Sequence, residues 1–164
     1  VLDDNLLACS EAHIRAVFAM LQRQNHKAEF TGGFEAALLK PWHVDLLTKL
    51  KPEQIFFAYD TPDDYEPLRE AARMMVEAGF DRHTLRAYAL VGYPKDTFDN
   101  ATTRLMDVVN LGIYPMAMLY HPDNGKTEKA WESFQRTWAR PALIHREVKN
   151  HKDKDHHSGK AVNQ

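Results

Sequence analysis

The sequence predicts an α/β fold, an incomplete TIM-like (β/α)6 barrel with parallel strands and a missing first strand. Short apolar segments alternate along the chain with segments that carry apolar residues at helical spacing. The apolar segments begin roughly 25 to 30 residues apart, which is the spacing of βα units in an eight-fold barrel. A doubly wound open sheet gives the same alternation, so the spacing alone leaves both architectures open.

The first segment, residues 1–5, reads as the end of a strand that lacks its beginning, and the chain opens on Val rather than Met. Both features lead us to expect missing upstream sequence. A helix is expected after Ser10, because serine is a favoured N-cap residue. Its apolar face follows at helical spacing and consists of Ile14, Val17, Phe18 and Leu21.

The next units follow the same order. A strand is expected over residues 27–31, a helix beginning at Pro41, and a strand over residues 54–59, which contain a continuous apolar run typical of a parallel sheet. Another helix should end at Gly79, since glycine is the usual residue after a helix C-cap. Its predicted apolar face is Leu68, Ala72, Met75 and Val76.

The last predicted strands span residues 84–91 and 113–120, with a helix between them that ends at Gly112. A final helix begins near Thr127, and Pro141 is expected to close it. Residues 149–164 are nearly all polar and predict a disordered tail. The expected organisation is therefore a domain over residues 1–148 followed by a tail over residues 149–164. The apolar face of the helix between the two strands is Ala101, Leu105, Val108 and Val109.

The composition of the chain limits the partners and the cellular compartment that we expect for it. The 164 residues include 27% charged residues and carry a formal net charge of −2, which gives no reason to expect nucleic acid or an anionic membrane as a partner. No apolar run approaches the ~20 residues that span a bilayer. The single cysteine, Cys9, cannot form an internal disulfide, and no signal peptide opens the chain, so we expect a cytoplasmic protein.

Polar residues and glycines follow each predicted strand. In barrels and open α/β sheets, binding sites form at the carboxyl ends of the strands. Carboxylates gathered there suit a ligand that offers amino and hydroxyl donors. The residues are Asp3, Asp4 and Asn5, then Glu35, then Asp60 and Thr61, then Gly92, Tyr93 and Pro94, and finally Tyr120.

Each of these groups also has a purely structural interpretation. The acidic residues before Ser10 favour turns. Asp60 could cap the next helix, although Asp63 or Asp64 is the better capping residue, which leaves Asp60 freer for a ligand. Gly92 and its neighbours could form a strand-end turn and nothing more.

Taken together, the motifs resemble the radical S-adenosylmethionine superfamily, most closely its cobalamin-binding and Elongator-like branch. Asp3-Asp4-Asn5 matches the motif that ends the second strand in that branch. Residues 33–38 (Gly-Phe-Glu-Ala-Ala-Leu) are similar to Gly-Leu-Asp-Ala-Arg-Leu, and residues 58–61 (Ala-Tyr-Asp-Thr) to Gly-Ile-Glu-Ser. Residues 91–97 (Val-Gly-Tyr-Pro-Lys-Asp-Thr) are similar to Val-Gly-Leu-Pro-Gly-Glu-Thr, with Lys95 in place of glycine.

The resemblance implies a partial barrel in which a [4Fe–4S] cluster reductively cleaves S-adenosylmethionine to a 5′-deoxyadenosyl radical. It implies that Asp3 or Asp4 accepts a hydrogen bond from the methionine amino group, and that Asp60 and Thr61 meet the ribose hydroxyls. Gly92 would let the backbone approach the nucleoside, and the sixth strand would pack near adenine. The cofactor-binding set is Asp3, Asp4, Asn5, Asp60, Thr61, Gly92, Tyr93, Pro94 and Tyr120.

The main difference from the family concerns the cysteines that bind the iron–sulfur cluster. Relatives hold it with a Cys-x3-Cys-x2-Cys loop after the first strand, whereas Cys9 stands alone after the second. We therefore expect Cys9 to be a small buried side chain, the cluster loop to lie upstream of Val1, and this chain alone to be inactive. No catalytic residue and no metal ligand is assigned within the chain.

Other interpretations stay open. The chain could be a non-catalytic α/β binding or regulatory domain, or another barrel enzyme that uses carboxylates as acid and base, although no carboxylate pair has a spacing that indicates this. The nine histidines lack metal-ligand spacing, and most are expected at the surface. A barrel without its first strand exposes a sheet edge, so the isolated chain is expected to self-associate. The sequence predicts neither the substrate nor a role for residues 121–164.

Overall fold

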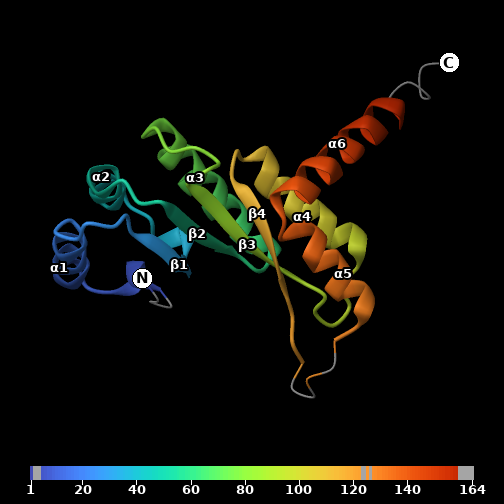
Figure 1. Cartoon of the computed structure of the whole chain (residues 1–164), viewed down its shortest axis with the longest axis horizontal. Coiled ribbons are helices and arrows are strands. Elements are labelled where there is room, and N and C mark those ends of the chain that lie inside the picture. The colour runs from blue at the N-terminus through green and yellow to red at the C-terminus, as the bar shows by residue number, and fades with distance from the viewer. Residues whose placement is uncertain (2–4, 123–124, 126, 159–164) are drawn as a thin grey trace.

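The computed structural model describes residues 1, 5–122, 125 and 127–158, and within them the chain forms one four-stranded parallel sheet with helices packed against it (Figure 1). The strands lie in chain order across the sheet. They are β1 (Glu29–Phe34), β2 (Gln54–Tyr59), β3 (Leu85–Val91) and β4 (Tyr114–Leu119). The α-helices are α1 (Glu11–Leu21), α2 (Pro41–Leu50), α3 (Tyr65–Glu77), α4 (Phe98–Asn110), α5 (Lys129–Trp138) and α6 (Pro141–Ser158).

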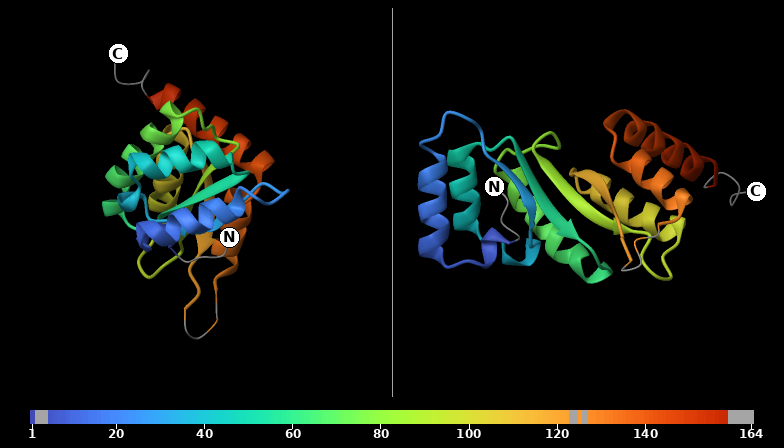
Figure 2. Two further views of the ribbon diagram at one scale, coloured as in Figure 1. Left: turned by 90° about the vertical axis from the view of Figure 1, so that its left-hand side faces the viewer. Right: turned by 60° about the horizontal axis from the view of Figure 1, so that its bottom comes forward.

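The helices at the two ends of the chain lie at opposite ends of the molecule. α1 and α2 lie beyond β1, and α5 and α6 lie beyond β4 (Figures 1 and 2). Three short 3-10 turns, Leu6–Ala8, Ala36–Leu38 and Pro62–Asp64, connect elements on the way. The sequence expectation of parallel strands alternating with helices is confirmed.

One face of the sheet is buried beneath α1, α2, α3 and α4. The register pairs Ile55 with Leu85 and Phe57 with Ala87, and alternate residues of a strand share a face. These four side chains are fully buried and belong to one continuous core. The helices contribute to this core Ile14, Phe18, Val44, Leu47, Leu68, Met75 and Val108.

A second core cluster joins the β4 end of the sheet to the C-terminal helices. Ala89, Val91 and Ala117 lie on the same buried face, and Trp138 of α5 and Ile144 of α6 pack with them. The C-terminal helices are thus part of the packed domain.

The opposite face of the sheet is largely half-buried. We call it the open face. Phe56 is more deeply buried, because it is only 4% exposed and its ring stacks on Tyr88 with centroids 4.5 Å apart, whereas Met118 is exposed. The register places the open-face residues in cross-strand rows, which are Phe56–Arg86–Tyr114, Ala58–Tyr88–Met116 and, in the last two strands, Leu90–Met118.

Local sequence signals set most element boundaries. The Ser10 hydroxyl accepts a hydrogen bond from the backbone N–H of His13 at 3.3 Å, which confirms Ser10 as the N-cap of α1. Pro41 is the first residue of α2, and Gly79 follows the C-cap of α3 with φ of +93°, as predicted. The apolar face predicted for α3 is wrong at Val76, which is 48% exposed, because Met75 rather than Val76 faces the sheet.

Two further expectations differ from the structure. Pro141 begins α6 rather than merely closing the preceding helix, since its fixed φ suits the first helical position. The predicted polar tail starts at residue 149, but α6 continues through that point to Ser158. Polarity alone does not oppose a helix, because lysine is a good helix former.

His43 is buried rather than at the surface, where most histidines were expected. Its Nδ1 accepts a hydrogen bond from the backbone N–H of Lys40 at 3.0 Å, which completes the start of α2. Burial, followed by the nearby Lys40 charge, lowers the pKa of His43. The imidazole is therefore a neutral capping group.

None of the described helices combines the length and apolar character that crossing a lipid bilayer requires.

Candidate functional site

The carboxyl ends of β1 and β2 form a pocket of about 390 Å³, which we call the β1–β2 pocket. Asn5, Glu35, Asp60 and Asp64 line it together with the glycines of β1. The Asn5 side-chain amide donates a hydrogen bond to a Glu35 carboxylate oxygen at 2.8 Å. Residues that are far apart in the sequence thus meet at one polar recess.

Asp64 shapes the loop that carries Asp60. One Asp64 carboxylate oxygen accepts hydrogen bonds from the backbone N–H groups of Asp60 at 3.1 Å and Thr61 at 2.8 Å. The same oxygen accepts a third bond from the Thr61 hydroxyl at 3.1 Å. Asp64 therefore caps the 3-10 turn Pro62–Asp64, and it occupies the N-cap position of α3 without a side-chain cap hydrogen bond. The Thr61 hydroxyl already donates its hydrogen bond to Asp64.

The Asp60 carboxylate receives no hydrogen bond or ion pair from any described residue. Asp60 is exposed overall, but its carboxyl lies in the recess, where burial and then the neighbouring Asp64 charge raise its pKa. A carboxylate that is partly desolvated and unpaired gains most from an ammonium or hydroxyl donor. Chemically, the β1–β2 pocket is suited to such donors.

The described residues on either side of Asp3 and Asp4 contact β1 and the residue that follows it. The backbone amino group of Val1 donates to the Glu29 carbonyl at 2.7 Å, and Asn5 contacts Glu35 just beyond the other end of the strand. Asp3 and Asp4 lie outside the described residues.

The carboxyl ends of β3 and β4 form a second pocket of about 270 Å³, the β3–β4 pocket. Four predicted site residues line it: Gly92, Tyr93, Pro94 and Tyr120. The backbone N–H of Tyr120 donates to the Val91 carbonyl at 2.9 Å, which continues the strand pairing past the end of β4.

Gly92 makes room for a protein side chain. Its φ is +74°, and a Cβ at this position would lie 3.0 Å from the indole ring of Trp131 and 3.1 Å from Leu119. Its backbone N–H is also used, because it donates to Asp96 at 2.8 Å. The close approach predicted from this glycine is therefore made by α5 packing against the loop.

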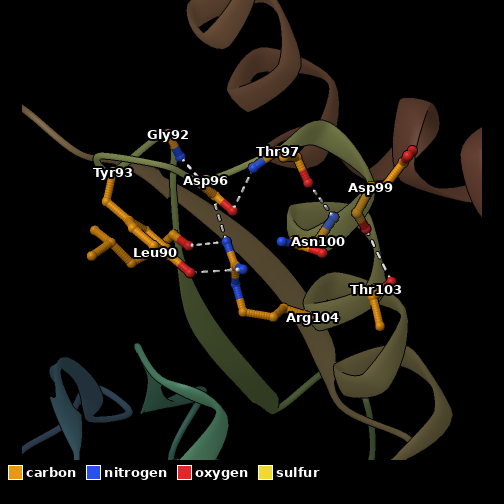
Figure 3. A network of polar contacts seen from close by, with 9 residues as sticks. All are labelled: Leu90, Gly92, Tyr93, Asp96, Thr97, Asp99, Asn100, Thr103 and Arg104. Atoms are coloured by element: carbon orange, nitrogen blue, oxygen red, sulfur yellow. Dashed lines mark hydrogen bonds and ion pairs between the residues drawn. The ribbon is translucent and has the colours of Figure 1, made fainter.

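A buried ion pair fixes the loop that follows β3 (Figure 3). Arg104 of α4 donates to Asp96 at 2.7 Å, and the two side chains are 7% and 0% exposed. The same guanidinium donates to the Leu90 carbonyl at 2.9 Å and to the Tyr93 hydroxyl at 3.1 Å. Asp96 also accepts from the Thr97 backbone N–H at 3.0 Å. The loop is thereby bound to the middle of α4 through Arg104 and to its N-cap through Thr97.

Within this loop Lys95 has a φ of +73°, in the left-handed region that favours glycine. This is the position at which Lys95 replaces the glycine of the similar family motif. The Asp96–Arg104 ion pair holds the residue next to Lys95 in place.

The structure divides the predicted site between two pockets. Asn5 and Asp60 share the β1–β2 pocket, with Thr61 beside them, whereas the later motifs line the β3–β4 pocket. Because the strands are parallel and neighbours lie about 4.8 Å apart, both pockets open at the same edge of the sheet.

Sequence reasoning missed Arg104 and the packing of Trp131 on Gly92. One signal was present for Arg104. It occupies the apolar face of the predicted helix, next to Leu105, where a cation needs a buried partner.

The fold and these pockets define an α/β protein with a parallel sheet and a polar carboxyl edge. Searches of protein-family models, of curated proteins and of solved structures find no match for this chain. Among the described residues, no group of three or more histidine, cysteine, aspartate and glutamate side chains is arranged to hold a metal ion.

Proposed function

We propose that this chain is a segment of a radical S-adenosylmethionine enzyme and that the carboxyl edge of its sheet binds S-adenosylmethionine. The observation that carries the proposal is the unpaired Asp60 carboxylate, which stands at the end of β2 beside Asn5 and Glu35. The family-like motifs at residues 33–38, 58–61 and 91–97 lie at the ends of β1, β2 and β3, which are neighbours in one parallel sheet.

The arrangement of the helices supports the barrel interpretation. α1 to α4 cover the same face of the sheet, and the strands lie in chain order. Consecutive βα units of a barrel have this arrangement, whereas a doubly wound sheet carries helices on both faces and reverses its strand order. We therefore interpret the sheet as part of a barrel wall, with the open face toward the barrel interior.

The pockets suggest how the parts of the ligand are distributed. Asp60 would accept hydrogen bonds from the ribose hydroxyls, and Glu35, held by Asn5, would accept from the methionine amino group. Pro94 and Tyr120 in the β3–β4 pocket would lie toward adenine. S-adenosylmethionine supplies the adenosyl group that enzymes of this family convert to a radical.

The chain's own residues do not fit the iron–sulfur cluster of the family. Such clusters need several thiolates, and the sequence contains only Cys9, which is half-buried just before α1. The proposal therefore assigns this chain a part in binding S-adenosylmethionine and no step of its cleavage. A Cys-x3-Cys-x2-Cys motif encoded upstream of Val1, within about one βα unit, is the corresponding expectation, and an intact gene without it excludes radical chemistry.

The test is calorimetric titration of the chain with S-adenosylmethionine, with Asp60→Asn as the variant and Asp63→Asn as the matched control. Both substitutions remove one carboxylate from the same short 3-10 turn region, but Asp63 is exposed and does not line the pocket. A hydrogen bond to a charged group contributes about 1.5–3 kcal/mol, so Asp60→Asn should weaken binding at least tenfold. Absence of saturable binding, or equal affinities for the two variants, contradicts the proposal.

A non-catalytic binding or regulatory domain is the second candidate, and the single cysteine favours it. Under this interpretation the chain binds S-adenosylmethionine, while the intact gene encodes no three-cysteine motif. The gene sequence and the titration together separate the two candidates.

A further inference from the structure

A positively charged side chain stands in the middle of the open face. Arg86 of β3 lies between Phe56 of β2 and Tyr114 of β4, because the register pairs it with both residues. Its guanidinium carbon lies 5.9 Å from the centre of the Phe56 ring and 5.3 Å from that of the Tyr114 ring. The two rings therefore flank the cation along one cross-strand row.

The Arg86 charge has no counter-ion among the residues that the structure describes. No described residue forms an ion pair or hydrogen bond with this guanidinium, and its Nε is buried without an acceptor. Arg104, the other arginine that the sheet helps to bury, has Asp96, Tyr93 and the Leu90 carbonyl. Aromatic rings attract a cation but accept none of its five N–H donors in the manner of an oxyanion.

A second polar atom on the same row is also without a partner. The Tyr114 hydroxyl is buried and has no hydrogen-bond partner among the described residues. Burial raises the pKa of Tyr114, so the hydroxyl keeps its proton and is a donor. A guanidinium and a phenol side by side, both lacking an acceptor, suit one oxyanion.

The surroundings define the rest of the ligand. The next row of the open face is Ala58–Tyr88–Met116, and a pocket of about 630 Å³ begins there, between β4 and α5. We call it the α5 pocket. Tyr88, Met116 and Met118 provide its apolar floor, and α5 provides a polar wall. An anionic head at Arg86 would thus continue into an apolar body over Tyr88.

We propose that Arg86 anchors a binding site on the open face for a small molecule with a carboxylate or phosphate head and an apolar body. Arg86 lies toward the amino end of β3, away from Asp60, whereas the α5 pocket extends to the carboxyl end of β4 and shares Leu119 and Thr127 with the β3–β4 pocket. The inference goes beyond S-adenosylmethionine binding and does not depend on it.

The test follows amide shifts in two-dimensional nuclear magnetic resonance spectra, at constant ionic strength, during titration with phenyl phosphate, benzoate and benzyl alcohol. The first two probes separate phosphate from carboxylate, and the third lacks the charge. The variants are Arg86→Gln and, as a matched control, Arg23→Gln, which removes an exposed arginine after α1. At least one anionic probe should shift Tyr88 and Met116 saturably and bind at least tenfold more weakly to Arg86→Gln, while Arg23→Gln binds as the unmodified chain does.

Two results would overturn the inference. One is the absence of saturable shifts with both anions, or equal affinity of the unmodified chain and Arg86→Gln. The other is a dimer in sedimentation experiments that Arg86→Gln dissociates, since a second copy of the chain would then supply the missing carboxylate. Arg86→Met, which keeps the side-chain volume, should leave the urea midpoint of the ligand-free chain unchanged or raised, so a loss of binding would not reflect unfolding.

Discussion

Asp96→Asn should destabilise the protein strongly, because it leaves Arg104 charged and buried without its counter-ion. The two side chains are 0% and 7% exposed, and their atoms approach to 2.7 Å. Removing one partner of a buried pair costs about 3–5 kcal/mol, a large part of the roughly 5–15 kcal/mol that stabilises a typical domain. With a urea dependence of about 2 kcal/mol per molar, the unfolding midpoint should fall by about 2 M.

The measurement is urea unfolding followed by far-ultraviolet circular dichroism. Arg104→Met and the double variant complete a mutant cycle, in which the double variant should be less destabilised than the sum of the single variants. Glu77→Gln is the control, since it interrupts an exposed ion pair with Arg73 and should leave the midpoint unchanged. A cost of Asp96→Asn below about 1 kcal/mol, or additivity within about 0.5 kcal/mol, would refute the reasoning.

Two further outcomes concern backbone strain and pH. Lys95→Gly should raise the free energy of unfolding by up to about 1 kcal/mol, because a φ of +73° costs a non-glycine residue about 1–2 kcal/mol. The greater entropy of glycine in the unfolded chain offsets part of this gain. Urea unfolding measures it, and a lower midpoint would contradict it. Burial, followed by the Asp107 carboxylate 3.3 Å away, raises the pKa of Tyr59 from 10.0 to about 12. Between these pH values the unfolded chain loses the proton and the folded chain keeps it, so the stability contribution present below pH 10 should decline by about 2–3 kcal/mol as pH rises to 12. Tyr59→Phe should flatten this part of the pH profile of the urea midpoint, and an unchanged profile would count against the assignment.

The strands and most helix boundaries could be predicted because their signals are local. The apolar run of β2 has the predicted bounds, residues 54–59, and the other three strands lie within a few residues of the predictions. Ser10, Pro41 and Gly79 each lie at the helix end that they determine, so a few neighbouring residues are enough to predict that boundary. Parallel order followed from the alternation of strands and helices.

The contacts that shape the candidate site join residues far apart in the sequence, and the sequence alone could not predict them. Gly92 is a glycine because Trp131, almost forty residues later, packs on it, and a short motif cannot show that. The pairing of Arg104 with Asp96 and the isolation of Arg86 depend equally on which strands and helices are neighbours. The polar residues and glycines at the strand ends were predicted as residue types, but their division between two pockets needed the structure.

The packing of Trp131 over Gly92 has a consequence for the architecture as a whole. Arg104 of α4 donates a hydrogen bond to the Leu90 carbonyl near the end of β3, and the Trp131 ring of α5 packs against Gly92 in the turn that follows. A shortened chain that stops after β4 would keep every strand but leave that turn uncapped and bare the Ala117 side of the core. The C-terminal helices therefore cover core residues of the sheet that precedes them, and the domain extends beyond its last strand.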